Sequence, residues 1–202
     1  MAKPFVIGIS GGSGAGKTTL ARKIIQHFDE AQISYLNLDW FYLDRSHLPL
    51  EERKEVNYDH PDALDFELLL NCLKRLITRK SIIVPQYDFN LHVRSKEVLK
   101  ITPSDTIVVD GILLFYSKQI RDLIDTKIFI DVLEKTRLER RIKRDILERG
   151  RTRQDVVDQF FATVAPMHET YVQPSIGYAE IVLNATDNFD ETMLRNQLLD
   201  KV

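Results

Sequence analysis

The sequence of 202 residues lacks several features that are typical of secreted and membrane proteins. It has one cysteine, Cys72, so no disulfide can form within the chain, which fits a reducing compartment. The apolar run near its start, Phe5–Ile9, has five residues, whereas a membrane-spanning helix needs about 20. We therefore expect a cytoplasmic protein with no membrane partner, in which Cys72 is a small buried side chain.

The sequence also lacks an excess of charge of one sign. It has 28 Lys and Arg against 30 Asp and Glu, a formal net charge of -2. A protein that coats nucleic acid needs a strong basic excess, so we expect a small-molecule partner and no nucleic acid, although a local basic patch stays open. With 44% hydrophobic and 29% charged residues the chain can bury a core, which excludes global disorder.

Short apolar runs alternate with longer segments of helical periodicity. Five runs predict buried strands: Phe5–Ser10, Ser34–Asp39, Thr106–Asp110, Lys127–Val132 and Glu180–Leu183. Helical spacing links Leu20, Ile24 and Phe28, and it recurs from Phe66 to Ile77. This alternation predicts an α/β three-layer sandwich with a mainly parallel five-stranded sheet, in which ligands bind beyond the carboxyl ends of the strands. No repeat or linker divides the chain, so we expect one domain over residues 1–202.

Two segments interrupt the alternation. Ile82–Phe89 and Glu97–Thr102 read as two strands with no helix between them, which predicts a β-hairpin arm over about residues 81–102. The polar segment Leu43–Asp62 reads as a long loop, and such loops in compact domains are usually functional or disordered.

The strongest motif is a phosphate-binding loop, the P-loop, which matches G-x-x-x-x-G-K-[ST] between a predicted strand and a predicted helix. Its glycines let backbone N–H groups converge on phosphate oxygens at the start of a helix. Lys17 is expected to reach the outer phosphates, and the hydroxyl of Thr18 to bind Mg²⁺. The expected nucleotide-binding residues of this segment are Gly11, Gly12, Ser13, Gly14, Ala15, Gly16, Lys17, Thr18 and Thr19.

A P-loop alone leaves motor, switch and kinase functions open. The length excludes a helicase-type motor, and the GTPase motif Asn-Lys-x-Asp has only an incomplete counterpart in residues 184–187, which lack the lysine. A small-molecule kinase needs an acceptor pocket, a carboxylate that orients the attacking hydroxyl, and a cationic lid. The rest of the sequence offers candidates for all three.

Two carboxylates close predicted strands and should lie at the same edge of the sheet as the P-loop. Asp110 is expected to be a second Mg²⁺ anchor, often acting through water, and Asp39 the base for the acceptor hydroxyl. The alternative is that each Asp only caps the turn after its strand. Of the aromatic residues after Asp39, Phe41 is expected in the core and Tyr42 in the pocket.

An arginine-rich segment over about residues 137–153 carries eight basic and three acidic residues, a local net charge of +5. Beside a P-loop we interpret it as a helical lid that clamps the transferred phosphate, with Gly150 as its flexible point. A solvated salt-bridged face and a nucleic-acid patch are the alternatives. His27, His47 and His168 have no metal-ligand spacing and are expected at the surface.

From about Phe5 to about Asn188 the sequence resembles the uridine–cytidine kinase family. Besides the P-loop, the resemblance rests on Asp39-Trp40-Phe41-Tyr42, Asn57-Tyr58-Asp59-His60-Pro61-Asp62-Ala63, Tyr87-Asp88-Phe89 with His92 and Arg94, Asp110-Gly111-Ile112-Leu113, and Arg140 to Asp145 with Glu148 to Arg151. It implies an ATP-dependent or GTP-dependent, Mg²⁺-requiring kinase that phosphorylates the 5′-hydroxyl of uridine or cytidine. A kinase for another ribosyl compound, such as nicotinamide riboside, and a catalytically silent nucleotide-binding regulator stay open, as does a homo-oligomer.

The resemblance also implies roles for individual residues. Lys17, Asp39, Arg141 and Arg144 would be catalytic, and Asp187 would lie near the nucleotide. Asp59 would hold the ribose hydroxyls, while Tyr87 and His92 would read the pyrimidine. The full set of expected substrate-binding residues is Tyr42, Tyr58, Asp59, Tyr87, Phe89, His92, Arg141, Arg151 and Gln159.

Overall fold

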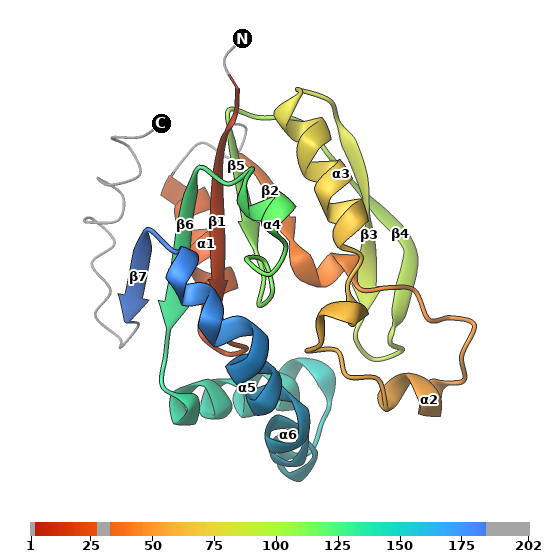
Figure 1. Ribbon diagram of the computed structural model, residues 1–202. Coiled ribbons are helices and arrows are strands. Elements are labelled where there is room, and N and C mark those ends of the chain that lie inside the picture. Colours follow the sequence, from red (N-terminus) through yellow and green to blue (C-terminus); the bar gives the residue numbers. More distant parts are fainter. Residues whose placement is uncertain (1–2, 28–32, 185–202) are drawn as a thin grey trace.

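The computed structural model describes residues 3–27 and 33–184 of the chain (Figure 1). Its centre is a five-stranded sheet in the order β2-β5-β1-β6-β7. The strands are β1 (Phe5–Gly11), β2 (Ile33–Asn37), β5 (Thr106–Asp110), β6 (Thr126–Asp131) and β7 (Ile181–Asn184). All four pairings in this sheet are parallel, which confirms the expected α/β architecture.

Helices cover both faces of the sheet because successive strand residues point to opposite sides. On one face Ile7 and Ile9 of β1 pack with Leu20 and Ile24 of α1 (Lys17–His27), within one apolar cluster. The opposite cluster joins Val6 to residues of α3 (Phe66–Ile77) and to Ile120 of the short helix α4 (Lys118–Arg121). Cys72 is buried in α3, as expected, and Phe28 lies outside the described residues.

The hairpin arm is a separate two-stranded sheet of β3 (Ile82–Asp88) and β4 (Val93–Ile101), which lies beside α3 on the right of Figure 1. The prediction that its second strand begins at Glu97 was wrong, because the ladder continues to the pair Asp88↔Val93. The register shifts between Pro85 and Tyr87. Pro85 has no N–H to donate, and the shift brings Tyr87 to the same buried side as Ile82 and Val84.

The second strand of the chain also ends earlier than predicted. β2 stops at Asn37, and a 3-10 turn, η2 (Leu38–Phe41), follows it. The side chain of Asn37 accepts a hydrogen bond of 2.7 Å from the backbone N–H of Asp39, which stabilises the turn. Phe41 is fully buried, as expected. The segment expected to be a long loop contains α2 (Leu50–Lys54), and η3 (Pro61–Ala63) begins near its end.

Helices α5 (Glu134–Arg149) and α6 (Arg153–Gln159) lie below the carboxyl ends of the strands in Figure 1, and the helical run after α6 rises from there along the sheet to β7. α5 ends at Gly150, whose φ of 61° belongs to the left-handed region that favours glycine. The helical run after α6 comprises η4 (Phe160–Val164), α7 (Ala165–Met167), η5 (His168–Val172) and η6 (Gln173–Tyr178). None of the described helices is long and apolar enough to cross a membrane.

The expectation that His168 lies at the surface was wrong, whereas His47 is exposed and the side chain of His27 lies outside the described part. Nε2 of His168 contacts Oε1 of Gln173 at 2.9 Å. A Cβ placed on Gly12 would come within 3.0 Å of His168 Cε1, so the ring packs against the P-loop. Burial, together with the charge of Arg137, lowers the pKa of His168 to about 4.

This burial predicts an acid-sensitive contribution to stability. Between about pH 4 and its ordinary pKa of 6.5, His168 binds protons more readily in the unfolded chain than in the folded one, so the free energy of unfolding falls as the pH drops through this window. His168→Gln should flatten that fall in urea titrations from pH 7 to pH 4.5. The exposed control His47→Gln should keep the wild-type dependence, and an unchanged dependence in His168→Gln would contradict the prediction.

Candidate active site

The P-loop connects β1 to α1 and has the backbone that its glycines predict. Gly11, Gly14 and Gly16 have φ values of 142°, 80° and 103°, which other residues adopt only with strain. A Cβ on Gly14 would also lie 2.3 Å from the carbonyl oxygen of Arg137, so only glycine fits there. The loop is therefore held between the start of α1 and the first turn of α5.

Lys17 is buried at the base of this loop. Its Nζ donates a hydrogen bond of 2.9 Å to the carbonyl oxygen of Gly12. Burial lowers the pKa of Lys17 to about 8, although the charges of Asp110 and Asp39 act in the opposite direction. The ammonium group has exchanged water for one neutral carbonyl, so an entering phosphate oxygen would be a stronger partner.

Thr18 and Asp110 lie together where β5 ends. Thr18 Oγ1 donates to Asp110 Oδ2 at 2.8 Å, and the hydroxyl of Tyr35 donates to Asp110 Oδ1 at 2.7 Å. Asn37 Nδ2 in turn donates to the Tyr35 oxygen at 3.1 Å. Burial raises the pKa of Asp110, while these two hydroxyl donors and the charge of Lys17 act to lower it.

The pair formed by Thr18 and Asp110 fits Mg²⁺. Mg²⁺ usually takes one or two protein oxygen ligands and completes its shell with phosphate oxygens and water. The described residues contain no cluster of three or more His, Cys, Asp or Glu side chains that could hold a metal. Tyr35 and Asn37 were missed by the sequence analysis, and their positions two residues apart in a strand that ends near Asp39 were the available signal.

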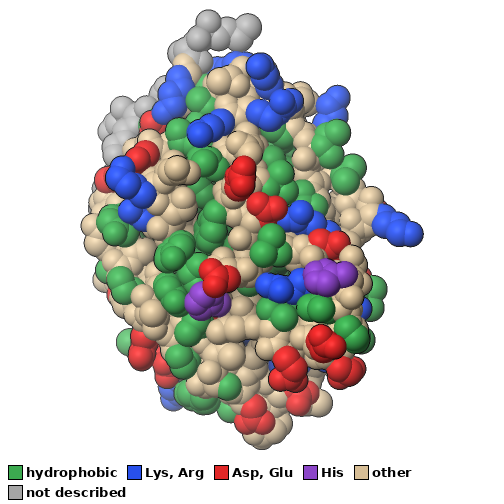
Figure 2. Space-filling model, turned by 45° about the vertical axis from the view of Figure 1, so that its right-hand side comes forward, with side chains coloured by type: hydrophobic (Ala, Val, Ile, Leu, Met, Phe, Trp, Pro, Cys, Tyr) green, Lys and Arg blue, Asp and Glu red, His purple; other side chains and the backbone are tan. Residues whose placement is uncertain are grey.

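Two further carboxylates, Asp39 and Asp59, lie within electrostatic range of Lys17. Asp59 is 7% exposed, and burial raises its pKa. The charges of Arg141, Arg144 and Lys17 act to lower that pKa, and the charge of Asp39 acts to raise it. Asp39 and Asp59 are therefore electrostatic neighbours beside the phosphate loop. Acidic, basic and histidine side chains also lie together over the lower half of the face shown in Figure 2.

Aromatic side chains from three segments form one wall of the site. The rings of Tyr58 and His92 stack with centroids 5.0 Å apart, and Tyr42 lies 5.0 Å from Tyr87 and 5.4 Å from Tyr58. Phe89 lies 5.4 Å from Tyr87. Burial raises the pKa of Tyr42, and the charges of Asp39 and Asp59 raise it further, so this ring lies within electrostatic range of both carboxylates.

Arg94 fixes the arm in place. Its Nε donates to the carbonyl oxygen of Tyr42 at 2.9 Å, and its Nη2 lies 3.0 Å from Asp65 Oδ2. Asp65 Oδ1 caps the start of α3 by accepting from the N–H of Leu68 at 2.9 Å. One guanidinium therefore ties the arm to both the turn after η2 and the first turn of α3, which positions the aromatic wall.

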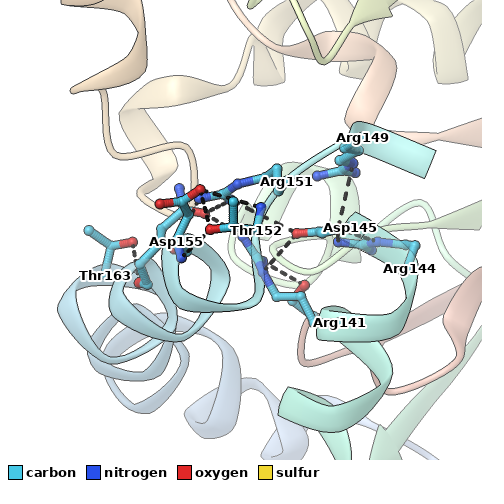
Figure 3. Close-up of polar contacts among 10 residues, drawn as sticks. Arg141, Arg144, Asp145, Arg149, Arg151, Thr152, Asp155 and Thr163 are labelled. Carbon is cyan, nitrogen blue, oxygen red and sulfur yellow. Dashed lines mark hydrogen bonds and ion pairs between the residues drawn. The ribbon is translucent and has the colours of Figure 1, made fainter. Parts of the chain in front are cut away.

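The expected lid contacts the P-loop directly. Arg141 is 6% exposed, and its Nη1 donates to Ser13 Oγ at 2.9 Å. Its Nη2 donates to Gln159 Oε1 at 3.0 Å, and Arg151 also donates to that oxygen. Arg144 and Arg151 reach Asp145, a buried carboxylate of α5 that the sequence analysis did not select (Figure 3). Arg137 is separate from this group, since its Nε donates to the carbonyl oxygen of Val132.

A cavity of about 640 Å³ opens beside the first turns of α5. Its lining includes Thr136 and Arg140 of α5, His168 and Gln173 of the helical run, and Asn184 at the end of β7. Asp187, expected near the nucleotide, lies outside the described residues.

The sequence-family model described as "Phosphoribulokinase / Uridine kinase family" matches residues 6–190. The chain belongs to this family. A curated relative named uridine kinase, from Geobacillus kaustophilus, is 45% identical over 181 residues, which cover 90% of this chain and 86% of the relative. Another uridine kinase, from Clostridium botulinum, is 46% identical over 183 residues, covering 91% and 89% of the two chains.

Solved structures of kinases share the fold at low sequence identity. Phosphoribulokinase from Rhodobacter spheroides superposes with a TM-score of 0.66 at 16% identity, covering 89% of this chain and 69% of that chain. D-glycerate 3-kinase from Cryptococcus neoformans gives a TM-score of 0.63 at 21% identity, covering 87% and 81%. These likenesses concern the architecture alone.

The hydrogen bonds around Asp110 predict a stability effect. Tyr35→Phe removes the donor to Oδ1 of a buried carboxylate, and leaving such an acceptor without its partner costs about 1–3 kcal/mol. The free energy of unfolding, measured with urea at pH 7, should fall by that amount. Tyr116→Phe, at a ring that is 47% exposed, is the matched control and should change it little. Equal stability of Tyr35→Phe and wild type would contradict the prediction.

Proposed function

We propose that the protein is a uridine/cytidine kinase, which transfers the γ-phosphoryl group of ATP, or of GTP, to the 5′-hydroxyl of a pyrimidine ribonucleoside. The product is UMP or CMP. The observation that carries the proposal is one P-loop that Arg141 contacts at Ser13 and Asp110 contacts at Thr18, with Asp39 and Asp59 within electrostatic range of its Lys17. The relatives named uridine kinase, which match about nine-tenths of the chain, support the same reaction.

The donor triphosphate would enter the P-loop, where backbone N–H groups and Lys17 bind its phosphates. Thr18 and Asp110 would hold Mg²⁺, which would neutralise part of the negative charge of the phosphates. The donor base is assigned to the cavity lined by Arg140 and Asn184.

Asp39 would act as general base toward the acceptor. Its carboxylate takes the proton of the 5′-hydroxyl, and the freed oxygen forms a bond to the γ-phosphorus. The bond from that phosphorus to the bridging oxygen breaks, and the nucleoside diphosphate leaves with the electron pair. Asp39 is suited to this role because it is half-exposed in a turn and its backbone N–H is anchored by Asn37.

The ribose and the base of the acceptor would bind on either side of Asp59. A carboxylate accepts hydrogen bonds and donates none, which suits the vicinal 2′- and 3′-hydroxyls of ribose. The hydroxyl of Tyr87 and the nitrogens of His92 can donate or accept, so they tolerate both uracil and cytosine. Tyr42, Tyr58 and Phe89 would supply the apolar wall on which the pyrimidine packs.

The lid would stabilise charge on the phosphoryl group as it moves. Arg141 contacts Ser13 of the P-loop, and Arg144, Arg151 and Gln159 are joined to Arg141 through Asp145 or through direct hydrogen bonds. Guanidinium groups bind phosphate oxygens through two parallel donors, and in a site that excludes water this stabilises the transition state.

A nucleoside panel tests this function. With Mg·ATP and with Mg·GTP, uridine and cytidine should give UMP and CMP, whereas adenosine, guanosine, nicotinamide riboside and ribulose 5-phosphate should react slowly or not at all. Nucleotide products are separated by anion-exchange chromatography. The absence of turnover with every pyrimidine ribonucleoside would overturn the assignment, and a preference for nicotinamide riboside would replace it.

The role of Asp39 is tested with Asp39→Asn, which preserves the shape of the side chain and removes the base. It should lower kcat by about 10²–10⁴-fold, the usual contribution of general base catalysis, with little change in the affinity for Mg·ATP. An unchanged kcat would remove Asp39 from the mechanism.

The ribose role of Asp59 predicts a change in substrate discrimination. Each lost hydrogen bond to a charged group costs about 1.5–3 kcal/mol, so Asp59→Ala should raise KM for uridine at least about tenfold while KM for ATP changes little. Wild type should favour uridine over 2′-deoxyuridine, and the variant should no longer separate them. Steady-state kinetics with both nucleosides measures this, and equal loss of affinity for uridine and ATP would refute the role.

A further inference from the structure

Asp145 lies in the second half of α5 and is completely buried. Four guanidinium groups surround its carboxylate (Figure 3). Arg144 Nε donates to Oδ1 at 2.8 Å, and Arg141 Nε lies 3.4 Å from Oδ2. Arg149 Nε lies 3.7 Å from Oδ1, and Arg151 Nη1 lies 3.9 Å from Oδ2. One anion therefore faces four cations.

Helix geometry and one glycine produce this arrangement. Arg141 and Arg149 stand four residues before and after Asp145, so they share its face of the helix. Gly150 ends the helix in the left-handed conformation, and the N–H of Arg151 then donates to the carbonyl oxygen of Asp145 at 3.1 Å. The backbone of Asp145 thus fixes the turn that returns Arg151 to its side chain.

Three of these arginines also reach different parts of the site. Arg141 extends to Ser13 of the P-loop and to Gln159 of α6, and Arg151 shares the Gln159 oxygen. Arg149 lies 4.2 Å from the centre of the Phe89 ring in the arm. The carboxylate of Asp145 is therefore the common contact of groups that touch the P-loop, α6 and the aromatic wall.

Exposed ion pairs contribute little to stability, but a fully buried carboxylate is strongly unfavourable unless its charge is compensated. Here the compensation comes from side chains that also lose much conformational entropy when they are ordered. If these side chains are ordered before substrates arrive, the transition state does not have to order them.

We infer that Asp145 is a positioning residue, which assembles Arg141, Arg144, Arg149 and Arg151 into one array before the substrates bind. It touches neither the donor nor the acceptor and acts through the arginines. The inference rests on the proposed function only in naming a transferred phosphoryl group as the target of the array. A different role, in which Asp145 competes with phosphate for the arginines and is displaced on binding, predicts opposite kinetics.

Kinetics of Asp145→Asn separate these roles. A misplacement of about 1 Å can reduce a rate by about 100-fold, so kcat should fall by about that factor while KM for uridine and ATP rises much less. The rate is expressed per active site, and the active sites are counted by titration with a tight-binding bisubstrate analogue. Asp145→Glu, which keeps the charge, should recover part of the loss. Tighter ATP binding with unchanged kcat would establish competition and overturn the inference, as would a loss that disappears after active-site titration.

The matched control is Asp158→Asn, which removes an exposed carboxylate from the neighbouring helix α6. It should keep wild-type kcat. If Asp145→Asn does not fold, Arg149→Gln remains informative, because it leaves Asp145 three partners and removes only the link from the array to Phe89. It should lower kcat by about tenfold, and wild-type kcat in a folded Arg149→Gln protein would overturn the inference.

A measurement without substrates keeps this inference independent of the proposed function. Arginine Nε–H signals in ¹⁵N NMR spectra of the free enzyme should include slowly exchanging protons, among them that of Arg144. Asp145→Asn should lose them while backbone amide signals of the sheet persist, and Asp158→Asn should retain them. Unchanged arginine signals in Asp145→Asn would overturn the inference. Failure of wild type to phosphorylate pyrimidine nucleosides would instead overturn the proposed function alone.

Discussion

The parallel pairing of β1 with β5 and β6 is the constraint on which the site depends. In a parallel sheet all strands end at one edge, so the P-loop after β1 and the side chains at the ends of β2 and β5 must meet there. The register places Asn37 opposite Asp110 and Ile9 opposite Asp110 on the other side. Thr18 and Tyr35 can then share one carboxylate, and the donor and acceptor halves of the site form around that edge.

The elements that the sequence predicts well are those with local signals. The five strands, α3 and the P-loop follow from apolar runs, helical spacing and the Gly-Lys-Thr sequence, and each lies within one or two residues of its expected bounds. Asp39 and Asp110 could be selected because strand ends in a parallel sheet point to ligands. Where a short-range hydrogen bond decides the backbone, as between Asn37 and Asp39, the strand boundary was missed.

Buried polar groups were the main features beyond prediction. Asp145 stands among so many arginines that its sequence context is typical of a solvated helix face, yet it is completely buried. Its burial depends on Arg141, which is held by Ser13 from 128 positions away in the chain. The burial of His168 also depends on a residue distant in sequence, because Gly12 leaves room for its ring. Such environments arise from tertiary contacts, and single-sequence patterns do not encode them.

The register shift after Pro85 decides which side chains of the arm tip face the site. Beyond the shift, alternate residues face the site, so Tyr87 and Phe89 point to it together. Loss or gain of one residue at this point would turn every side chain of the arm tip to the opposite side at once. The arm can therefore exchange the whole set of side chains that it turns toward the site in a single evolutionary step, while the sheet edge that carries the P-loop remains unchanged.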